Sequence, residues 1–200
     1  YAKRKYKLSR ILIADFDVHH GNGTQEIFYS DPSVLYFSTH QYPWYPGTGS
    51  IHEDGAGEGK GFTINVPLPA YCGDKEHLRA YNEILVPVAR RFKPQLILVS
   101  AGYDPHWADQ LSLMQLSVSG FASIVSIIKQ LADELCGGKL LLSLEGGYNL
   151  EALSYSIKAT FEVLLGNAPS PDPLGKPHEM TMSPDISPIL EEVKLRHKLT

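Results

Sequence analysis

The stretch ILIADFDVHHGNGT, residues 11 to 24, decides the fold. It begins as a short apolar run with β-branched side chains, which is typical of a buried strand. Two carboxylates, Asp15 and Asp17, and two imidazoles, His19 and His20, follow at once, before glycines that permit a turn. Charged side chains at the end of a strand need a partner, because burying an unpaired charge is costly. A bound cation would be that partner.

The alternation of side chains along an extended chain separates the two histidines. Asp17 and His19 point the same way, with Asp15 below them on the same face, so Asp17 and His19 can reach one metal ion together. His20 points to the other face, which favours a structural, hydrogen-bonded role over catalysis. The alternative is that the whole cluster is a solvated turn without an ion.

Two later apolar runs argue against that alternative, because they end in the same way. Residues 95–104 end in SAGYD, and residues 139–149 end in EGGYN. Ligands of open α/β sheets bind outside the carboxyl ends of parallel strands. The three strand ends are therefore expected to converge on one site, with Asp104 as a third metal ligand and Tyr148 beside it.

The expected ligands are typical of a catalytic metal. Asp17, His19 and Asp104 supply oxygen and nitrogen and leave one position open, which is the pattern of catalytic zinc. Two carboxylates and one histidine also suit Fe²⁺ or Co²⁺. The phenol of Tyr148, beside a Gly-Gly turn, can donate to an oxyanion; the alternative is a core tyrosine after a tight turn.

The rest of the chain alternates strands and helices, which predicts an α/β fold: an open parallel β-sheet with helices on both faces. Further strands are expected over 34–39 and 62–66, and helices over 23–29, 76–92, 117–136 and 150–165. Residues 41–61 form a long loop of the kind that is usually functional. We expect one domain over 1–166 and a proline-rich tail over 167–200, with a short helix opening at Ser187-Pro188.

Composition restricts the function further. The chain has 200 residues and a net charge of −4, so it can bury one core and offers no basic surface for nucleic acid. We expect no membrane partner, because no apolar run approaches the ~18 residues of a membrane span. Cys72 and Cys136 are far apart and are expected to be reduced thiols, which favours a cytoplasmic protein.

Four blocks, in this order, resemble the histone deacetylase superfamily, which includes acetylpolyamine amidohydrolases and acetoin-utilisation proteins. They are DFDVHHGNGTQ at 15–25, YPGTG at 45–49, SAGYD at 100–104 and EGGYN at 145–149. The resemblance covers roughly residues 7 to 166 and is strongest to the class II and bacterial branches. It implies an arginase/deacetylase-like fold and a Zn²⁺-dependent amidohydrolase that removes acetyl or short acyl groups from lysine side chains or related amines, with Tyr148 stabilising the oxyanion.

The resemblance also implies supporting residues. A structural K⁺ or Na⁺ would be held by oxygens of Asp15, Asp17 and His19, with Ser38 and Thr39 from the neighbouring strand. Asp15 and Asn22 would orient a pair of family histidines that lie upstream of the Asp15 strand. The acyl-lysine tunnel would be lined by Tyr45, Leu111, Gly146 and Gly147. The polyamine-selective eukaryotic branch has glutamate where Leu111 stands, which disfavours a long cationic polyamine. His106 and Asp109 either orient a ligand or are solvated, and the sequence does not decide between these.

One part of the family pattern is absent from these 200 residues. The family's general base is a pair of histidines after a Pro-Gly, upstream of the Asp15 strand, and no Pro-Gly-His-His occurs here. The resemblance thus implies a C-terminal portion of a deacetylase domain, with a sheet incomplete at its N-terminal side and little activity in isolation. Its exposed apolar edge would bind the N-terminal portion or a second copy. The alternatives are a catalytically incomplete protein that binds an acyl ligand, and a small-molecule deacetylase of the acetylpolyamine or acetoin type.

Overall fold

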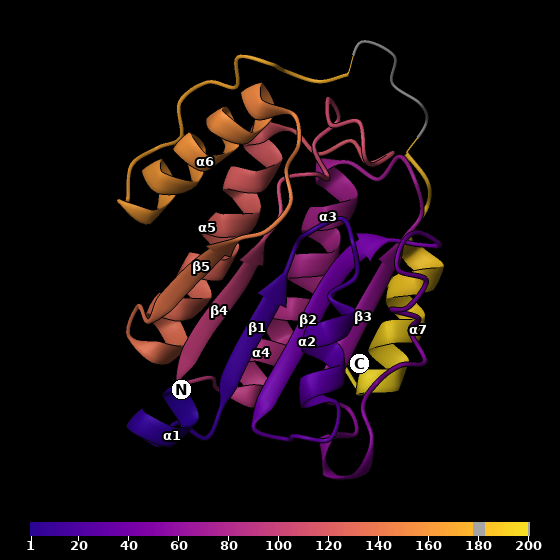
Figure 1. Cartoon of the computed structure of the whole chain (residues 1–200), viewed down its shortest axis with the longest axis vertical. Helices are drawn as coiled ribbons and strands as arrows, with labels where there is room; N and C mark the ends of the chain where they lie inside the picture. Colours follow the sequence, from indigo (N-terminus) through magenta and orange to yellow (C-terminus); the bar gives the residue numbers. More distant parts are fainter. Residues whose placement is uncertain (178–182, 200) are drawn as a thin grey trace.

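The chain forms a parallel sheet, seen in a computed structural model that describes residues 1–177 and 183–199 (Figure 1). Within these ranges the strand order is β3-β2-β1-β4-β5, and every neighbouring pair is parallel. The strands are β1 (Ile11–Asp15), β2 (Val34–Gln41), β3 (Thr63–Leu68), β4 (Leu96–Ala101) and β5 (Leu140–Leu144). The register pairs Asp15 with both Ser38 and Ser100, so the carboxyl ends of the central strands lie at one edge. The predicted parallel α/β architecture is confirmed.

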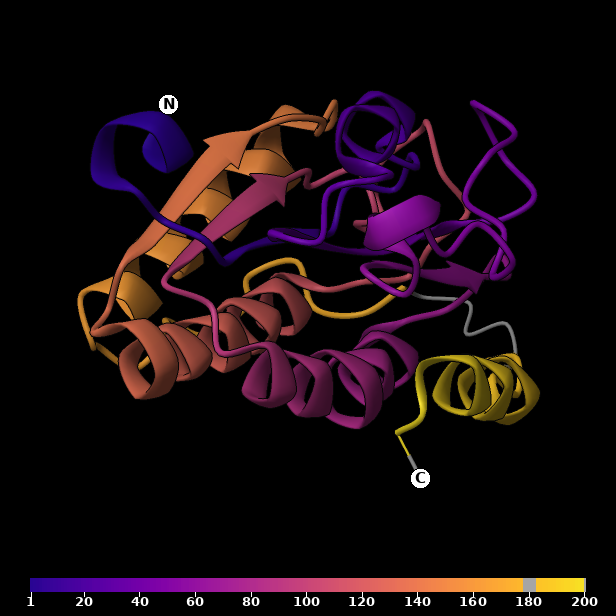
Figure 2. The same cartoon turned by 90° about the horizontal axis from the view of Figure 1, so that it is seen from below.

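One face of the sheet is covered by helices, which lie below it in Figure 2. These helices are α3 (Asp74–Ala80), the π-helical turn η2 (Tyr81–Leu85), α4 (Val86–Phe92), α5 (Val118–Cys136) and α7 (Ser187–His197); α6 (Leu150–Leu164) packs against α5. Helix α5 begins at the Ser117 cap, whose hydroxyl accepts from the Gly120 amide, and ends where Gly137 adopts the left-handed conformation. The predicted helix over 117–136 is thus confirmed at both ends.

The opposite face is covered less completely. Helices α1 (Ala2–Tyr6) and α2 (Asn22–Phe28) lie on it, and Phe28 packs against a small cluster of Ile13, Val34 and Tyr36. A 3₁₀ turn, η1 (Gly57–Gly59), lies in the long loop. Beside α1 the face is hollowed into an apolar cavity of about 1080 Å³. Helices therefore lie on both faces, but unevenly.

Strand β5 corrects an expectation drawn from its sequence. Its leucine-rich run indicated a buried strand, yet Leu141 is 56% and Leu144 is 58% exposed. The reason is its place in the sheet: among the described strands β5 pairs with β4 alone, and Leu141 lines the apolar cavity beside α1.

The C-terminal helix also differs from its prediction in detail. Helix α7 begins at Ser187 with Pro188 in its first turn, but its cap is Ile186, not Ser187. Leu190 and Val193 are fully buried in the main core, so α7 packs as part of the same folded unit. Part of the expected irregular tail, 178–182, lies outside the described residues. Among the helices that are described, none combines the length and hydropathy needed to cross a membrane.

Candidate metal centre

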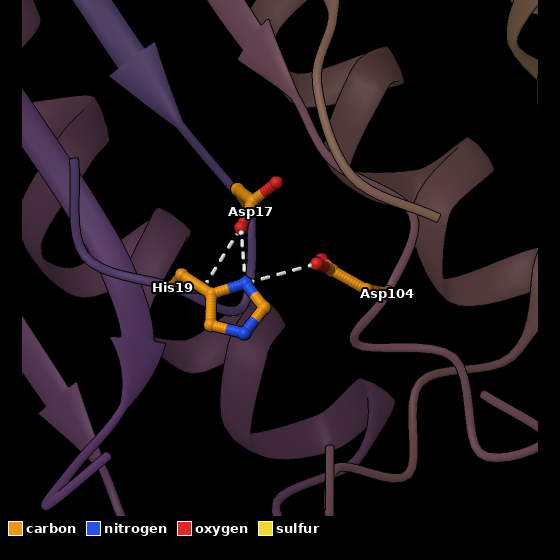
Figure 3. A group of neighbouring side chains, drawn as sticks. All are labelled: Asp17, His19 and Asp104. Atoms are coloured by element: carbon orange, nitrogen blue, oxygen red, sulfur yellow. Dashed lines mark hydrogen bonds and ion pairs between the residues drawn. The ribbon is translucent and has the colours of Figure 1, made fainter. Parts of the chain in front are cut away.

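The ends of β1 and β4 bring three potential metal ligands together (Figure 3). Asp17 and His19 follow β1 and Asp104 follows β4; one ligand atom from each lies within 4.8 Å of the others. His19 Nδ1 is 3.1 Å from Asp17 Oδ1 and 3.1 Å from Asp104 Oδ2. The structure thus brings together the three residues that the sequence predicts as ligands.

The buried carboxylate of Asp104 fits a cation. Its side chain is 0% exposed, and Oδ1 accepts from the Val18 amide at 2.9 Å. Oδ2 lies near His19 but has no partner with hydrogen-bond geometry. A buried anionic oxygen without a donor is costly, and burial accordingly raises the pKa of Asp104. A divalent cation would satisfy this oxygen, and two carboxylates with one imidazole suit Zn²⁺, Fe²⁺ or Co²⁺.

His19 holds a proton in the place where a cation would lie. The close contacts of Nδ1 with the carboxylates of Asp104 and then of Asp17 raise the pKa of His19 to about 10. The protonated Nδ1 lies between the two carboxylates and offsets part of their charge. A metal bound here would take this position and displace the proton.

Two glycines allow the carboxylates to lie this close to the backbone. A Cβ at Gly102 would lie 2.1 Å from Asp17 Oδ2, and one at Gly146 would lie 2.2 Å from Asp104 Oδ2. The Gly146 amide also donates to Asp17 Oδ2 at 2.8 Å. Gly146, expected in the substrate tunnel, therefore also shapes the ligand positions.

A cavity of about 610 Å³ opens above these ligands. Most of the residues expected around the site line it: Asp15, Asp17, His19, Asn22, Tyr45, Leu111, Gly146 and Tyr148. Asp104 lies beneath it, and Ser38, Thr39 and Gly147 are not among its lining residues. Reasoning from the sequence did not single out Ser100, Leu144 and Glu145, which also line it. Ser100 and Glu145 could have been found, because they open the blocks SAGYD and EGGYN at the strand ends.

Two aromatic side chains stand at the mouth of this cavity. Tyr148 is 58% exposed, and the ring of Tyr45, also exposed, is edge-on to His19 with centroids 6.1 Å apart. Burial, and then the charges of Asp104 and Asp17, raise the pKa of Tyr148. The phenol therefore keeps its proton at neutral pH and can donate a hydrogen bond.

Asp109 neither orients a ligand directly nor is solvated, which were the two interpretations of the sequence. It is buried, and its Oδ2 accepts from the amides of Tyr148 (2.7 Å) and Asn149 (2.9 Å). It therefore anchors the turn that carries Tyr148. His106 is also buried rather than solvated, and its Nδ1 accepts from the Ala108 amide.

The residues expected behind the metal are mostly buried. Asp15 accepts from the Asp17 amide (3.1 Å) and the Tyr36 hydroxyl (3.0 Å); burial, and then the charge of Asp17, raise its pKa. Ser38 lies beside Asp15 in the sheet, and Thr39 Oγ1 is buried without a hydrogen-bond partner. Asn22 is exposed at the start of α2. A K⁺ or Na⁺ ion at Asp15, Asp17, His19, Ser38 and Thr39 stays a prediction, and so does the role of Asp15 and Asn22 in orienting upstream histidines.

Comparison with known proteins indicates the same family as the sequence motifs. Residues 1–164 match the family model described as the histone deacetylase domain. "Histone deacetylase 10, chloroplastic" of Oryza sativa subsp. japonica is 51% identical over 166 residues, which are 83% of this chain and 38% of that protein. A "Probable deacetylase" of Archaeoglobus fulgidus is 47% identical over 153 residues, covering 76% of this chain and 43% of that protein.

Solved structures agree with this. The crystal structure of the HDA15 HD domain has a TM-score of 0.82 at 36% identity, covering 97% of this chain and 52% of that one. The structure of the histone deacetylase Clr3 has a TM-score of 0.86 at 36% identity, covering 98% of this chain and 33% of that one. This chain spans about two-fifths of the length of the rice and archaeal relatives. With the family model matched over most of its length, the chain belongs to the histone deacetylase family.

Proposed function

We propose that this chain carries the metal-binding part of a zinc-dependent amidohydrolase that removes acetyl or short acyl groups from lysine side chains or related amines. The supporting observation is the meeting of Asp17, His19 and the buried Asp104 carboxylate beneath a cavity lined by Tyr148. Zn²⁺ bound there would supply Lewis acidity and lower the pKa of a water molecule.

The chain's own residues then act on the substrate. Tyr45 and Leu111 line the entrance and would contact the acyl-lysine chain. The hydroxyl of Tyr148 would donate to the carbonyl oxygen as that oxygen becomes negative. Loss of one such donor typically reduces the rate by ~10² to 10³. Asp109 would keep this tyrosine in place through the backbone of its turn.

The proton transfers need a base and an acid, and in the family that the motifs resemble these are imidazoles; among the residues described, the imidazoles near this cavity are already engaged. Its lining imidazoles are His19, the proposed ligand, and His20, whose two ring nitrogens are both hydrogen-bonded. His40 likewise has both nitrogens bonded, to Ser38 and Gly49. We propose that another segment, the N-terminal portion of a deacetylase domain, supplies this chemistry.

The apolar cavity beside β5 would receive that segment. Ile11, Ile13, Leu98 and Leu141 line it, on the same face of the sheet as Asp15 and Ser100 farther along the strands. A segment that covers these side chains and pairs with β5 would therefore reach the metal cavity. A second copy of this chain is the other possible occupant, and the association state of the pure chain distinguishes the two.

Metal content tests the proposed ligands. Purified chain loaded with Zn²⁺ and then desalted is expected to retain about one ion, because three protein ligands typify catalytic zinc sites. Asp17→Ala and His19→Ala are expected to lose it, whereas Asp133→Ala, which removes an exposed carboxylate on α5, is not. Full stoichiometry in either ligand variant, measured by atomic emission, would show that the ligands are wrong.

Acetate release tests the reaction. The chain alone is expected to release little acetate from an acetyl-lysine peptide, and adding the N-terminal half of the archaeal relative should restore release, because that half would bring the base. In the restored complex, Tyr148→Phe should reduce the rate by ~10² to 10³. Robust hydrolysis by the monomeric chain alone would place the base within it.

The same assay decides the alternative function. In the described part of the chain, both imidazoles that line the cavity are already engaged, and this favours a protein that binds an acylated ligand without hydrolysing it. Binding of a hydroxamate with no acetate release, with or without the added half, would support that function. Comparing acetylated histone tails, other acetylated proteins and small acetylated amines would identify the substrate class.

A further inference from the structure

A buried cluster of hydrogen bonds lies behind the metal-binding turn and joins α2 to the long loop. The side chain of Gln25 is at its centre. Gln25 Nε2 donates to Glu53 Oε2 at 2.6 Å, while Gln25 Oε1 lies 2.8 Å from Asn65 Nδ2 and 3.0 Å from His20 Nε2. His20 is buried, at 3% exposure, next in sequence to the proposed ligand His19.

Glu53, the acidic residue of this cluster, determines which atoms donate and which accept in these hydrogen bonds. Glu53 also accepts from the backbone amides of Gly49 and Ser50, each at 3.1 Å. Burial raises the pKa of Glu53, but the hydrogen bonds from Gln25 and Gly49 outweigh it and hold that pKa below its ordinary value. An ionised carboxylate only accepts hydrogen bonds, so Gln25 must turn its amide nitrogen toward Glu53 and its oxygen toward His20.

This orientation assigns the tautomer of His20. An amide oxygen can only accept, so His20 donates to it from Nε2. His20 Nδ1 then faces the Thr48 hydroxyl at 2.7 Å, and that hydroxyl has a hydrogen to give. Both nitrogens of the neutral ring are satisfied in this arrangement and in no other.

The same cluster holds the loop that forms one wall of the cavity. The ring of His40 packs on that of His20, with centroids 4.7 Å apart, and His40 Nε2 donates to the Gly49 carbonyl at 2.9 Å. A Cβ at Gly49 would lie 2.3 Å from His40 Nε2, so the loop lies directly on these rings. Tyr45, four residues earlier, stands edge-on to His19.

We propose that Glu53 is a positioning residue for the metal site: through Gln25 it fixes the tautomer and orientation of His20, and through Gly49 and Ser50 it fixes the loop. The backbone of His19 is thereby held so that its Nδ1 faces Asp17 and Asp104. This inference rests on the proposed function only in taking His19 as a metal ligand.

The decisive variant is Glu53→Gln. If its amide oxygen keeps the Gly49 and Ser50 amides, its NH₂ group meets the NH₂ group of Gln25, and two donors repel each other. The Gln25 amide is expected to rotate and present its nitrogen to His20, and the Asn65 amide, whose nitrogen lies 2.8 Å from Gln25 Oε1, is expected to rotate with it so that its oxygen faces the Gln25 nitrogen. The ring proton of His20 should then move from Nε2 to Nδ1, which two-bond ¹H–¹⁵N correlation spectra of the histidine rings detect. His40, bonded to a backbone carbonyl, should keep its proton on Nε2 and is the internal reference.

Metal affinity is the second readout, with Co²⁺ as the probe and its visible absorption as the signal. Glu53→Gln is expected to weaken Co²⁺ binding about tenfold, because groups behind a ligand typically contribute 10- to 100-fold. The double variant Gln25→Glu, Glu53→Gln moves the carboxylate to position 25 and keeps every donor opposite an acceptor. It should restore both the Nε2 tautomer and the affinity. Glu26→Ala, which removes the exposed neighbour of Gln25 on α2, should change neither.

Each other outcome overturns the proposal. An unchanged His20 tautomer in Glu53→Gln would show that the carboxylate does not set it. A loss of affinity that the double variant does not restore would indicate a merely structural role. If the unaltered chain binds no Co²⁺, the proposed metal site fails, while the tautomer spectra still decide whether Glu53 controls His20.

Discussion

Gly146→Ala is expected to weaken metal binding by about a hundredfold while the chain stays folded. The added Cβ would lie 2.2 Å from Asp104 Oδ2 and 2.7 Å from Asp17 Oδ2, so the carboxylates of both proposed ligands must move. Changes in the groups that orient metal ligands reduce affinity by ~10- to 100-fold, and this variant displaces the ligands themselves. Competition with a chromophoric chelator measures the affinity, and a thermal melt of the metal-free chain checks the fold.

Gly23→Ala is the matched control. A Cβ at Gly23 meets nothing within 4 Å, and the position lies on α2, where alanine is favoured over glycine by ~1 kcal/mol. This variant should bind metal as the unaltered chain does and melt no lower. Equal affinity in Gly146→Ala would mean that Asp17 and Asp104 are not held as ligands in the arrangement seen here.

The convergence of the site could be predicted because it follows from local patterns and one topological rule. Apolar runs identify β1 and β4, and in a parallel sheet their carboxyl ends must lie at one edge. The alternation of side chains then separates His19 from His20. The structure bears out both steps, with His19 between two carboxylates and His20 in a buried hydrogen-bonded cluster.

Features that depend on distant partners could not be predicted. Asp109 holds the amide of Tyr148, 39 residues later, and nothing in the spacing indicates this contact. Glu53 and Gln25 meet only because the long loop folds back over α2. The exposure of β5 could not be predicted either, since a leucine-rich run has the same sequence pattern whether or not another segment covers it. Sequence patterns describe one element at a time, whereas burial is a property of the assembled sheet.

Zn²⁺ affinity is expected to rise about a hundredfold between pH 6 and pH 8. In the metal-free site, the close contacts of its Nδ1 with the carboxylates of Asp104 and then of Asp17 raise the pKa of His19 to about 10, so its ring keeps a proton throughout this range. Metal binding must displace that proton, because only the neutral imidazole is a ligand. Each unit of pH below 10 therefore costs about a factor of ten in apparent affinity, and the affinity grows as pH rises. A proton on Asp104, whose pKa burial raises, would add to the dependence in the same direction.

Calorimetric titration with Zn²⁺ in two buffers of different ionisation enthalpy measures the displaced proton, and about one proton per ion is expected at pH 7.5. Asp104→Asn removes the largest of the contacts that raise the pKa of His19, so that pKa should fall, although Asp17 still raises it. In that variant the affinity should be lower at pH 8 and should depend less steeply on pH between pH 6 and pH 8. His40 cannot produce the effect, because burial lowers its pKa to about 3 and it gains no proton in this range. An affinity that does not change from pH 6 to pH 8, with no proton released, would show that His19 is not the residue the ion displaces.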